Sequence, residues 1–277
     1  MNSNDYNYEN WKTEAKEFWE KSQENINEDE IVKKCVRLAF RDLTVRTMKS
    51  KKDIDKPVIL DELAIDCCEE EEAGKTYLKL IKDWLEGCEE LPENRFLSLH
   101  DDLCNIVIKC LKKKYEDDYC TYGKAQKIVN MTFKYLYAYH CSKDDSSSWS
   151  EESFKFCHMP LDSFTLEWFG RKIPNVTKGK IGAWSNIQKK EKNNRKSYEY
   201  EFYQERIKTY FETYYAKEGI TPLRAEFVIW PSIQKELAVE TFIFTFKPIT
   251  EVSKRQDVRK ESLDDKIRWV KELVKKM

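Results

Sequence analysis

Helix breakers are sparse in this chain: glycine and proline occur only seven times each among 277 residues. An all-β sandwich or barrel needs a turn at the end of every short strand, and these two residues supply most such turns. Long stretches without either residue therefore favour helices. We expect a mainly α-helical fold.

Hydrophobic periodicity supports this expectation, because apolar residues recur every three to four positions along most of the chain. The segments with helical spacing are residues 10–23, 29–49, 73–88, 103–115, 124–140, 160–169 and 198–216, a further helix that begins at Pro222, and the charged amphipathic stretch 255–276. Residues 239–246 differ. There, phenylalanines alternate with other residues, and this period of two predicts a strand.

The length fits one large domain or two lobes that share a core. We expect residues 1–277 to form a single helical domain of two lobes around a cleft. Residues 101–170 would form its central part, and residues 171–277 would add a basic loop and the C-terminal helices.

Several features predict a cytoplasmic protein that does not enter a membrane. No apolar run approaches the roughly 20 residues that span a bilayer. The first nine residues are polar and lack the apolar core of a signal peptide. The nine cysteines are odd in number and scattered, which indicates buried free thiols rather than disulfides. No paired metal-ligand spacing occurs, so we expect no metal and no cofactor.

Charge is unevenly distributed although the net charge is only −1. Between Tyr119 and Lys196, fourteen basic residues face seven acidic ones, and from Arg171 to Lys196 the ratio is nine to one. A charged run of this kind is either a solvated face or a binding site for a polyanion. The second interpretation predicts nucleic acid as the partner.

Two helices joined by a short turn that contains a glycine form a helix-hairpin-helix arrangement. Here residues 103–115 precede a turn that ends at Gly123, and the next helix opens with Lys124, Gln126 and Lys127. Backbone N–H groups at such a helix start can bind a phosphate. Asn130 follows one turn after Lys127 and was expected on the same polar face.

The pattern around Lys127, together with the segment Pro160-Leu161-Asp162, resembles the helix-hairpin-helix DNA glycosylase superfamily. The separation of 35 residues between Lys127 and Asp162 is most similar to the archaeal 8-oxoguanine branch. The usual Leu-Pro-Gly-x-Gly hairpin is replaced by residues 118–123. The resemblance implies that Lys127 is a nucleophile and Asp162 a catalytic carboxylate, and that residues 101–170 are the catalytic core.

The implied activity is excision of a damaged or modified base from double-stranded DNA by a monomer, in repair or in phage defence. A glycosylase extrudes its target base and holds it against flat groups. The residues expected to contact DNA or the base are Tyr122, Gly123, Lys124, Gln126, Asn130, His158, Trp168, Lys178, Lys180 and Trp184. The alternatives are a non-enzymatic helical protein that binds nucleic acid and a protein-interaction or defence component.

Overall fold

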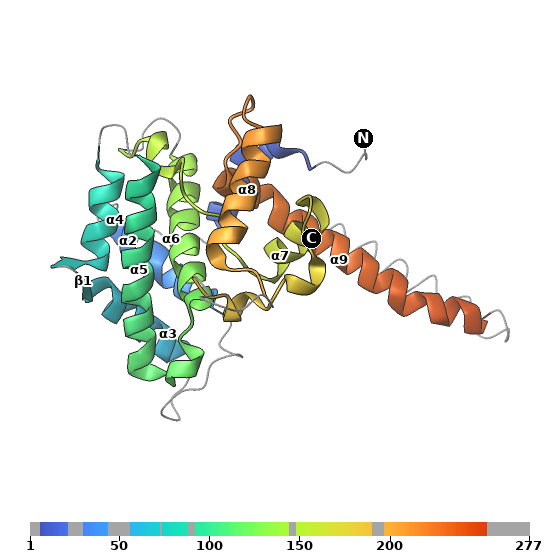
Figure 1. Ribbon diagram of the computed structural model, residues 1–277, viewed down its shortest axis with the longest axis horizontal. Coiled ribbons are helices and arrows are strands. Elements are labelled where there is room, and N and C mark those ends of the chain that lie inside the picture. The colour runs from blue at the N-terminus through green and yellow to red at the C-terminus, as the bar shows by residue number, and fades with distance from the viewer. Residues whose placement is uncertain are drawn as a thin grey trace. The chain divides into compact units, whose positions relative to one another are not determined.

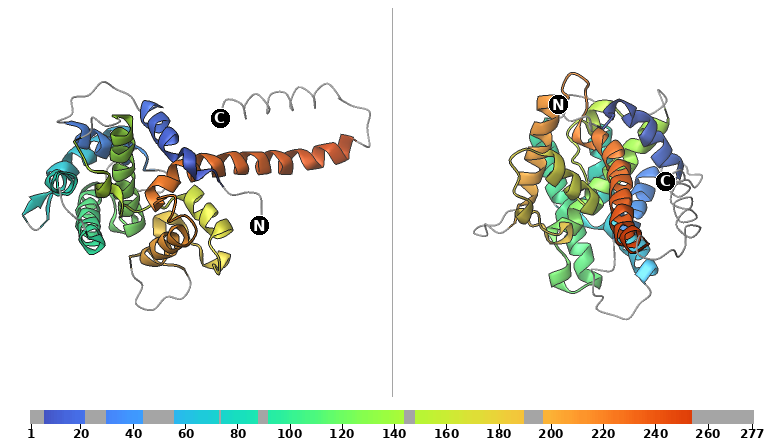
Figure 2. Two further views of the ribbon diagram at one scale, coloured as in Figure 1. Left: turned by 90° about the horizontal axis from the view of Figure 1, so that it is seen from above. Right: turned by 90° about the vertical axis from the view of Figure 1, so that its right-hand side faces the viewer.

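The computed structural model describes residues 6–21, 30–43, 56–72, 74–87, 92–143, 148–189 and 197–253, and these are mainly helical (Figures 1 and 2). The chain divides into two compact units, Met1–Val228 and Ile229–Met277. The boundary lies inside one long helix. All sites considered below belong to the first unit.

The described part of the chain contains nine α-helices. They are α1 (Trp11–Lys21), α2 (Ile31–Arg41), α3 (Lys56–Glu69), α4 (Tyr77–Leu85), α5 (Glu93–Lys114), α6 (Tyr122–Ser142), α7 (Ser163–Lys172), α8 (Tyr200–Tyr214) and α9 (Pro222–Ser253). Short 3-10 turns include η6 (Glu151–Phe154), η7 (Lys178–Lys180) and η8 (Trp184–Asn186). The prediction of a mainly α-helical protein is confirmed.

Helix α6 forms the centre of the first unit. The helices α1, α2 and α5 and the turn η8 pack against it, and α5 runs beside it in Figure 1. Every residue from 122 to 139 is buried. Such a helix has no solvated face, so each of its polar side chains needs a partner inside the protein. The polar face expected for Lys127 and Asn130 is therefore an internal one.

The strand predicted at residues 239–246 is wrong, because α9 continues through this segment. The alternating pattern is short, and β propensity depends strongly on having a neighbouring strand. A lone strand would leave its backbone N–H and C=O groups without partners, whereas a helix satisfies its own. The Thr221 carbonyl accepts from Ala225 N–H at 3.0 Å where α9 begins.

Two other element boundaries differ from the predictions. Helix α5 begins at Glu93, ten residues before the predicted start. The helix predicted at residues 73–88 begins only at Tyr77, where Thr76 caps it by accepting from Lys79 N–H at 3.2 Å. Before it, the strands β1 (Glu71–Glu72) and β2 (Lys75–Thr76) pair antiparallel. The helix predicted at residues 255–276 lies outside the described residues.

The eight described cysteines are all buried, and none of them forms a disulfide. This confirms the prediction of buried free thiols for those positions. Among the helices described, none is both long enough and apolar enough to cross a membrane.

Candidate functional site

The segments that carry Lys127 and Asp162 are bound to one another. The Gln126 amide Nε2 donates to the Leu161 carbonyl at 3.0 Å, and Leu161 N–H donates to Gln126 Oε1 at 3.3 Å. Each partner directly precedes one of the two predicted catalytic residues. The fold therefore brings positions 35 apart in sequence onto adjacent segments.

Asp162 is the N-cap of α7. Its Oδ1 accepts from the backbone N–H groups of Phe164 at 2.9 Å and Thr165 at 3.0 Å, and from the Thr165 hydroxyl at 3.2 Å. Aspartate is a preferred cap because its oxygen satisfies amides that the first helical turn leaves unpaired. The residue is only 9% exposed.

Lys127 lies against Trp184, with its Nζ 4.7 Å from the centre of the indole ring. The lysine is 8% exposed. Trp184 begins the turn η8, and Ile187 follows this turn directly. Gly123 N–H donates to the Ile187 carbonyl at 2.8 Å, which holds the turn against α6. A Cβ atom at Gly123 would overlap the Trp184 carbonyl oxygen, so this close approach requires glycine.

Two carboxylates, the half-buried Asp42 and the buried Glu226, lie within electrostatic reach of both Lys127 and Asp162. Burial raises the pKa of Asp42, while a hydrogen bond from Tyr135 (2.7 Å) and the charge of Lys127 oppose the rise and the charge of Asp162 adds to it. Burial also raises the pKa of Glu226, which the charges of Lys134 and Lys127 oppose. The four charged side chains therefore share one buried region.

Lys134 completes this region from the next turns of α6. Its ammonium forms an ion pair with Glu226, and both side chains are almost fully buried. The ammonium also lies 4.4 Å from the Phe18 ring centre. Lys134 and Glu226 thus neutralise one another in a largely dry setting.

Four of the residues predicted to contact DNA serve the interior instead. Lys124 donates to the Tyr119 carbonyl at 2.7 Å, and burial lowers its pKa. Gln126 and Asn130 are fully buried. Trp168 is fully buried too, with its ring stacked on Phe211 at 5.8 Å between centres. None of the four presents a surface to DNA in this structure, because each is enclosed by the fold.

The helix start predicted to bind phosphate already uses its amides within the chain. Gly123 N–H donates to Ile187, while Lys124 N–H and Ala125 N–H both donate to the Thr121 carbonyl at 3.2 Å. A phosphate at this position would have to displace these bonds.

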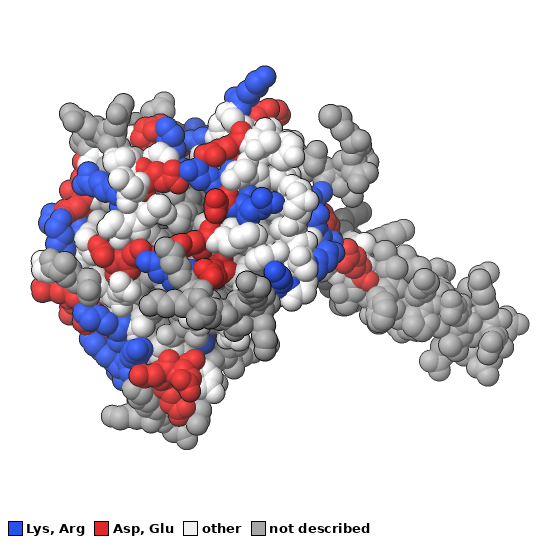
Figure 3. Space-filling model, viewed as in Figure 1, with Lys and Arg blue, Asp and Glu red and all other residues white. Residues whose placement is uncertain are grey.

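The basic segment from Arg171 to Lys196 is only partly exposed as a basic surface. Lys178 and Lys180, on η7, are exposed. Arg171 pairs with Glu167 and Lys189 with Asp101. Residues 190–196 lie outside the described part of the chain. On the face in Figure 3, blue and red side chains are interspersed rather than gathered by sign.

Lys178 and Trp184 also line a small pocket of about 410 Å³, which Ser163 and Leu166 of α7 close from below the Asp162 cap. A basic side chain, a flat ring and the neighbourhood of Lys127 and Asp162 therefore meet at one place. Lys180 lies beside it, 5.9 Å from the Tyr198 ring centre.

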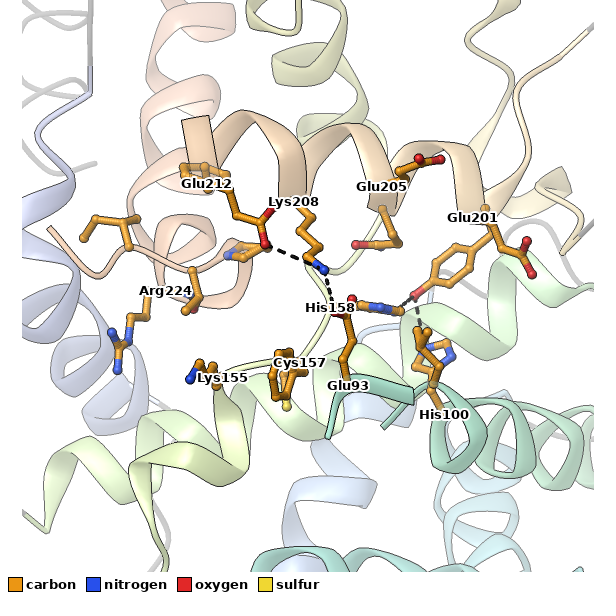
Figure 4. A pocket seen from close by; sticks show the side chains of 18 of the residues that line it. Glu93, His100, Lys155, Cys157, His158, Glu201, Glu205, Lys208, Glu212 and Arg224 are labelled. Atoms are coloured by element: carbon orange, nitrogen blue, oxygen red, sulfur yellow. Dashed lines mark hydrogen bonds and ion pairs between the residues drawn. The ribbon is translucent and has the colours of Figure 1, made fainter. Parts of the chain in front are cut away.

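A larger cleft of about 760 Å³ lies elsewhere, between α5, α8 and the segment around η6 (Figure 4). Tyr122 and His158 line it, so two of the residues predicted to contact the base lie apart from Lys127 and Asp162. His100 and Tyr200, which were not predicted, meet there. The Tyr200 hydroxyl lies 2.8 Å from His158 Nδ1 and 3.1 Å from His100 Nε2.

A helical pattern could have revealed His100. With Phe96, Leu103 and Val107 it follows the apolar period of α5, but the predicted helix began too late to include it. Tyr200 carried no comparable signal, because a tyrosine near a helix start is common in a chain with 15 tyrosines.

No group of three or more metal-ligating side chains occurs among the residues described. Comparisons of the chain with protein-family models, with curated proteins and with solved structures found no match.

Proposed function

We propose that the protein is a DNA N-glycosylase in which Lys127 attacks the sugar and Asp162 supplies the catalytic carboxylate. The observation that carries the proposal is the pair of hydrogen bonds between Gln126 and Leu161. These bonds hold the lysine and aspartate segments together, as the resemblance to the helix-hairpin-helix glycosylases requires.

The chemistry assigns one task to each side chain. The neutral Lys127 amine forms a bond to the anomeric carbon while the bond from that carbon to the base breaks, and the base leaves with a proton. Positive charge develops on the sugar, and the Asp162 carboxylate stabilises it. After the attack one proton of the amine passes to the departing base, and the second passes to the ring oxygen as the sugar ring opens to give an imine.

Trp184 lies next to two parts of this scheme, the lysine nucleophile and the small pocket. Its ring lies against the Lys127 side chain, with Nζ 4.7 Å from the ring centre. The same residue lines the small pocket beside Asp162 with Lys178 at its edge. An extruded base that displaces the indole would lie beside Lys127.

Borohydride trapping tests the nucleophile. The full chain is incubated with duplexes that carry oxidised, alkylated, deaminated or phage-type modified bases, and borohydride reduces any imine to a stable cross-link. We expect a cross-link in the wild type and none in Lys127→Gln. Lys178→Gln, which loses the same charge from an exposed turn, should still form it.

Base release tests the carboxylate. Asp162→Asn should slow release by about 100-fold or more, the scale expected when a positioned charge stabiliser is lost. Release without trapping in Lys127→Gln would assign the attack to water and leave Asp162 as the essential group. If no base is released from any of these substrates, the glycosylase proposal fails.

A second candidate is a non-enzymatic protein that binds nucleic acid. The cation–π contact with Trp184 gives Lys127 a structural role that needs no chemistry, and the exposed η7 turn offers Lys178 and Lys180 to phosphates. This candidate predicts duplex binding without base release. The Lys178→Ala/Lys180→Ala variant should then reduce the slope of log affinity against log salt by about two.

A further inference from the structure

The 760 Å³ cleft has no role in the proposed function, because neither Lys127 nor Asp162 lines it. Its volume falls in the range of about 300–1,000 Å³ that is typical of small-molecule sites. Its walls come from α5, α8 and the chain around Cys157 and His158 (Figure 4). The cleft is therefore a separate candidate binding site.

Carboxylates dominate the rim of the cleft. The charged residues that line it are Glu93, Asp101, Glu151, Glu152, Glu201, Glu205 and Glu212 on the acidic side and Lys155, Lys189, Lys208 and Arg224 on the basic side. Figure 4 shows Lys208 joined to Glu93 and Glu212. The exposed Glu205 forms no ion pair with any described residue. The excess of carboxylates favours a cation over an anion as ligand.

The floor of the cleft is ordered by a chain of hydrogen bonds that begins at Gln126. Its Nε2 donates to the carbonyls of Gly123 (2.8 Å) and Leu161 (3.0 Å), and its Oε1 accepts from Leu161 N–H. The roles of backbone groups are fixed, so they fix the orientation of this amide. Gln126 Oε1 can then only accept from Asn130 Nδ2, which lies 2.9 Å away.

Asn130 passes this orientation to His100. Since Asn130 Nδ2 faces Gln126, its Oδ1 faces His100 Nε2 at 3.0 Å and must accept. His100 Nε2 therefore carries a proton. Burial lowers the pKa of His100 to about 4, so the ring is neutral near pH 7 and its Nδ1 is an acceptor.

Tyr200 fixes which nitrogen of His158 carries the proton. Its hydroxyl lies 2.9 Å from Asn130 Nδ2 and 3.1 Å from His100 Nε2, both of which carry protons. The hydroxyl proton must therefore go to His158 Nδ1, at 2.8 Å. Burial lowers the pKa of His158 and keeps the ring neutral, which places its proton on Nε2. That N–H makes no hydrogen bond with the described residues.

We infer that the cleft binds a small organic cation, with an amine near the carboxylates of α8 and a hydrogen-bond acceptor on His158 Nε2–H. The apolar side chains of Leu97, Phe156 and Ile220, which line the same cleft, suit an apolar body between these two groups. A single ligand that meets all three groups has an amine at one end, an apolar body in the middle and a hydrogen-bond acceptor at the other end.

Three matched probes separate the two ends of such a ligand. They are 4-(2-aminoethyl)pyridine, with an amine and a ring-nitrogen acceptor; phenethylamine, with the amine alone; and 4-ethylpyridine, with the acceptor alone. Binding is measured by titration calorimetry or by NMR shifts of the full chain at about pH 8, where pyridine nitrogens are neutral and alkylamines are charged. We expect the first probe to bind about fivefold more tightly than either of the others.

Two variants assign the two contacts. Glu201→Gln/Glu205→Gln should weaken both amines by about fivefold and leave 4-ethylpyridine unchanged, while Glu17→Gln, on α1, should change nothing. Tyr200→Phe removes the hydroxyl that orients His158, so it should abolish the preference for the pyridine over the phenyl amine. In this test Tyr200 acts through the orientation of His158, whose Nδ1 lies 2.8 Å from the Tyr200 hydroxyl.

The outcomes are distinct from those of the glycosylase assays, since they are read from binding of the three probes and not from base release or trapping. Saturable binding of the aminopyridine with both losses supports the inference. If none of the three probes binds, or if binding ignores the carboxylate variant, the cation site is overturned. If the two amines bind equally in the wild type, the assignment of His158 is overturned.

Discussion

Two polar regions that meet along helix α6, the charged side around Lys127 and Lys134 and the neutral side around Asn130, solve the same problem differently. Both must hold polar groups in the protein interior. Around Lys127 and Lys134 the groups are charged and almost unexposed, and Glu226 forms an ion pair with Lys134. Around Asn130 the groups are neutral amides, hydroxyls and imidazoles that orient one another beside an open cleft.

The difference between a buried ion pair and a neutral hydrogen-bond network indicates where a ligand or substrate can be bound. Burying an ion pair costs desolvation energy, and removing one partner leaves the other charge buried without compensation. Both partners must therefore be replaced together. A neutral hydrogen-bond network costs less to bury, and it can expose one oriented donor at a cavity without leaving a charge unpaired. The charged side matches a catalytic motif in sequence, whereas the neutral side has a cavity and no motif.

The largest predicted effect breaks the charged side. Lys134→Met leaves Glu226 buried without its partner and should reduce the free energy of unfolding by about 3–5 kcal/mol at neutral pH. Because the unpaired carboxyl would bind a proton, the loss should grow as pH rises. Denaturation in urea at several pH values measures both effects.

The double variant Lys134→Met/Glu226→Met is the matched control. With both charges gone, the site becomes apolar, and such replacements are often neutral or stabilising. We expect most of the lost stability to return. A double variant as unstable as Lys134→Met would mean that the ion pair does not carry the stability of this side.

The next effect tests the neutral side through pH. The pKa of His100 is lowered to about 4 by burial, whereas the unfolded chain titrates near 6.5. The unfolded state binds the proton first, so stability falls as pH decreases from about 6.5 to about 4, by at most about 3 kcal/mol. Urea denaturation across this range should show the slope.

His100→Gln sharpens this prediction. Glutamine can still donate to Asn130 but does not titrate, so its stability should be lower at neutral pH and flatter between pH 6.5 and 4. An unchanged pH slope in the variant would show that other groups cause the acid sensitivity.

The sequence predicted more of the charged side than of the neutral one. The pattern of Gly123, Lys127 and Asp162 predicted that the segments carrying Lys127 and Asp162 lie together. A motif with fixed spacing can be recognised in a single sequence. The prediction that Lys127 and Asp162 are catalytic remains a prediction. Trp184 was predicted as a flat group that contacts the base, and that role stays a prediction; its contact with Lys127 is a finding of the structure.

The neutral side could not be predicted because its parts come from four separated segments. His100, Asn130, His158 and Tyr200 have no common spacing, and only tertiary packing brings them to one cleft. The general helical fold followed from periodicity, since sparse breakers leave few alternatives. The strand predicted at residues 239–246 is wrong because a short alternation does not specify a strand where no neighbouring strand is available for pairing in the described part of the chain.

The third effect concerns the contact between η8 and α6. Gly123→Ala should reduce the free energy of unfolding by about 1–3 kcal/mol, because the new methyl group overlaps a backbone oxygen that cannot turn away. The same shift should move Trp184 off Lys127. Gly179→Ala, with open space around its Cβ position, should change stability by less than about 0.5 kcal/mol. Equal effects of the two substitutions would contradict the close approach.

The smallest effect separates structure from chemistry at Asp162. Asp162→Ala removes the oxygen that accepts from Phe164 and Thr165, and should cost about 1 kcal/mol of stability. Asp162→Asn keeps an oxygen acceptor at the cap, so its stability should stay within about 0.5 kcal/mol of the wild type. Thermal or urea denaturation of the two variants measures the difference.

Asp162→Asn then becomes the cleanest probe of the charged side, because it removes the carboxylate charge and keeps the fold. If the variant is as stable as the wild type but releases base far more slowly, the charge serves catalysis and the oxygen serves the helix cap. If stability and base release are both unchanged, Asp162 is a helix cap alone, and the charged side of α6 is a structural solution. If the variant loses several kcal/mol, the carboxylate charge belongs to the buried network of Asp42 and Glu226, and its effect on catalysis must be measured after that loss is restored.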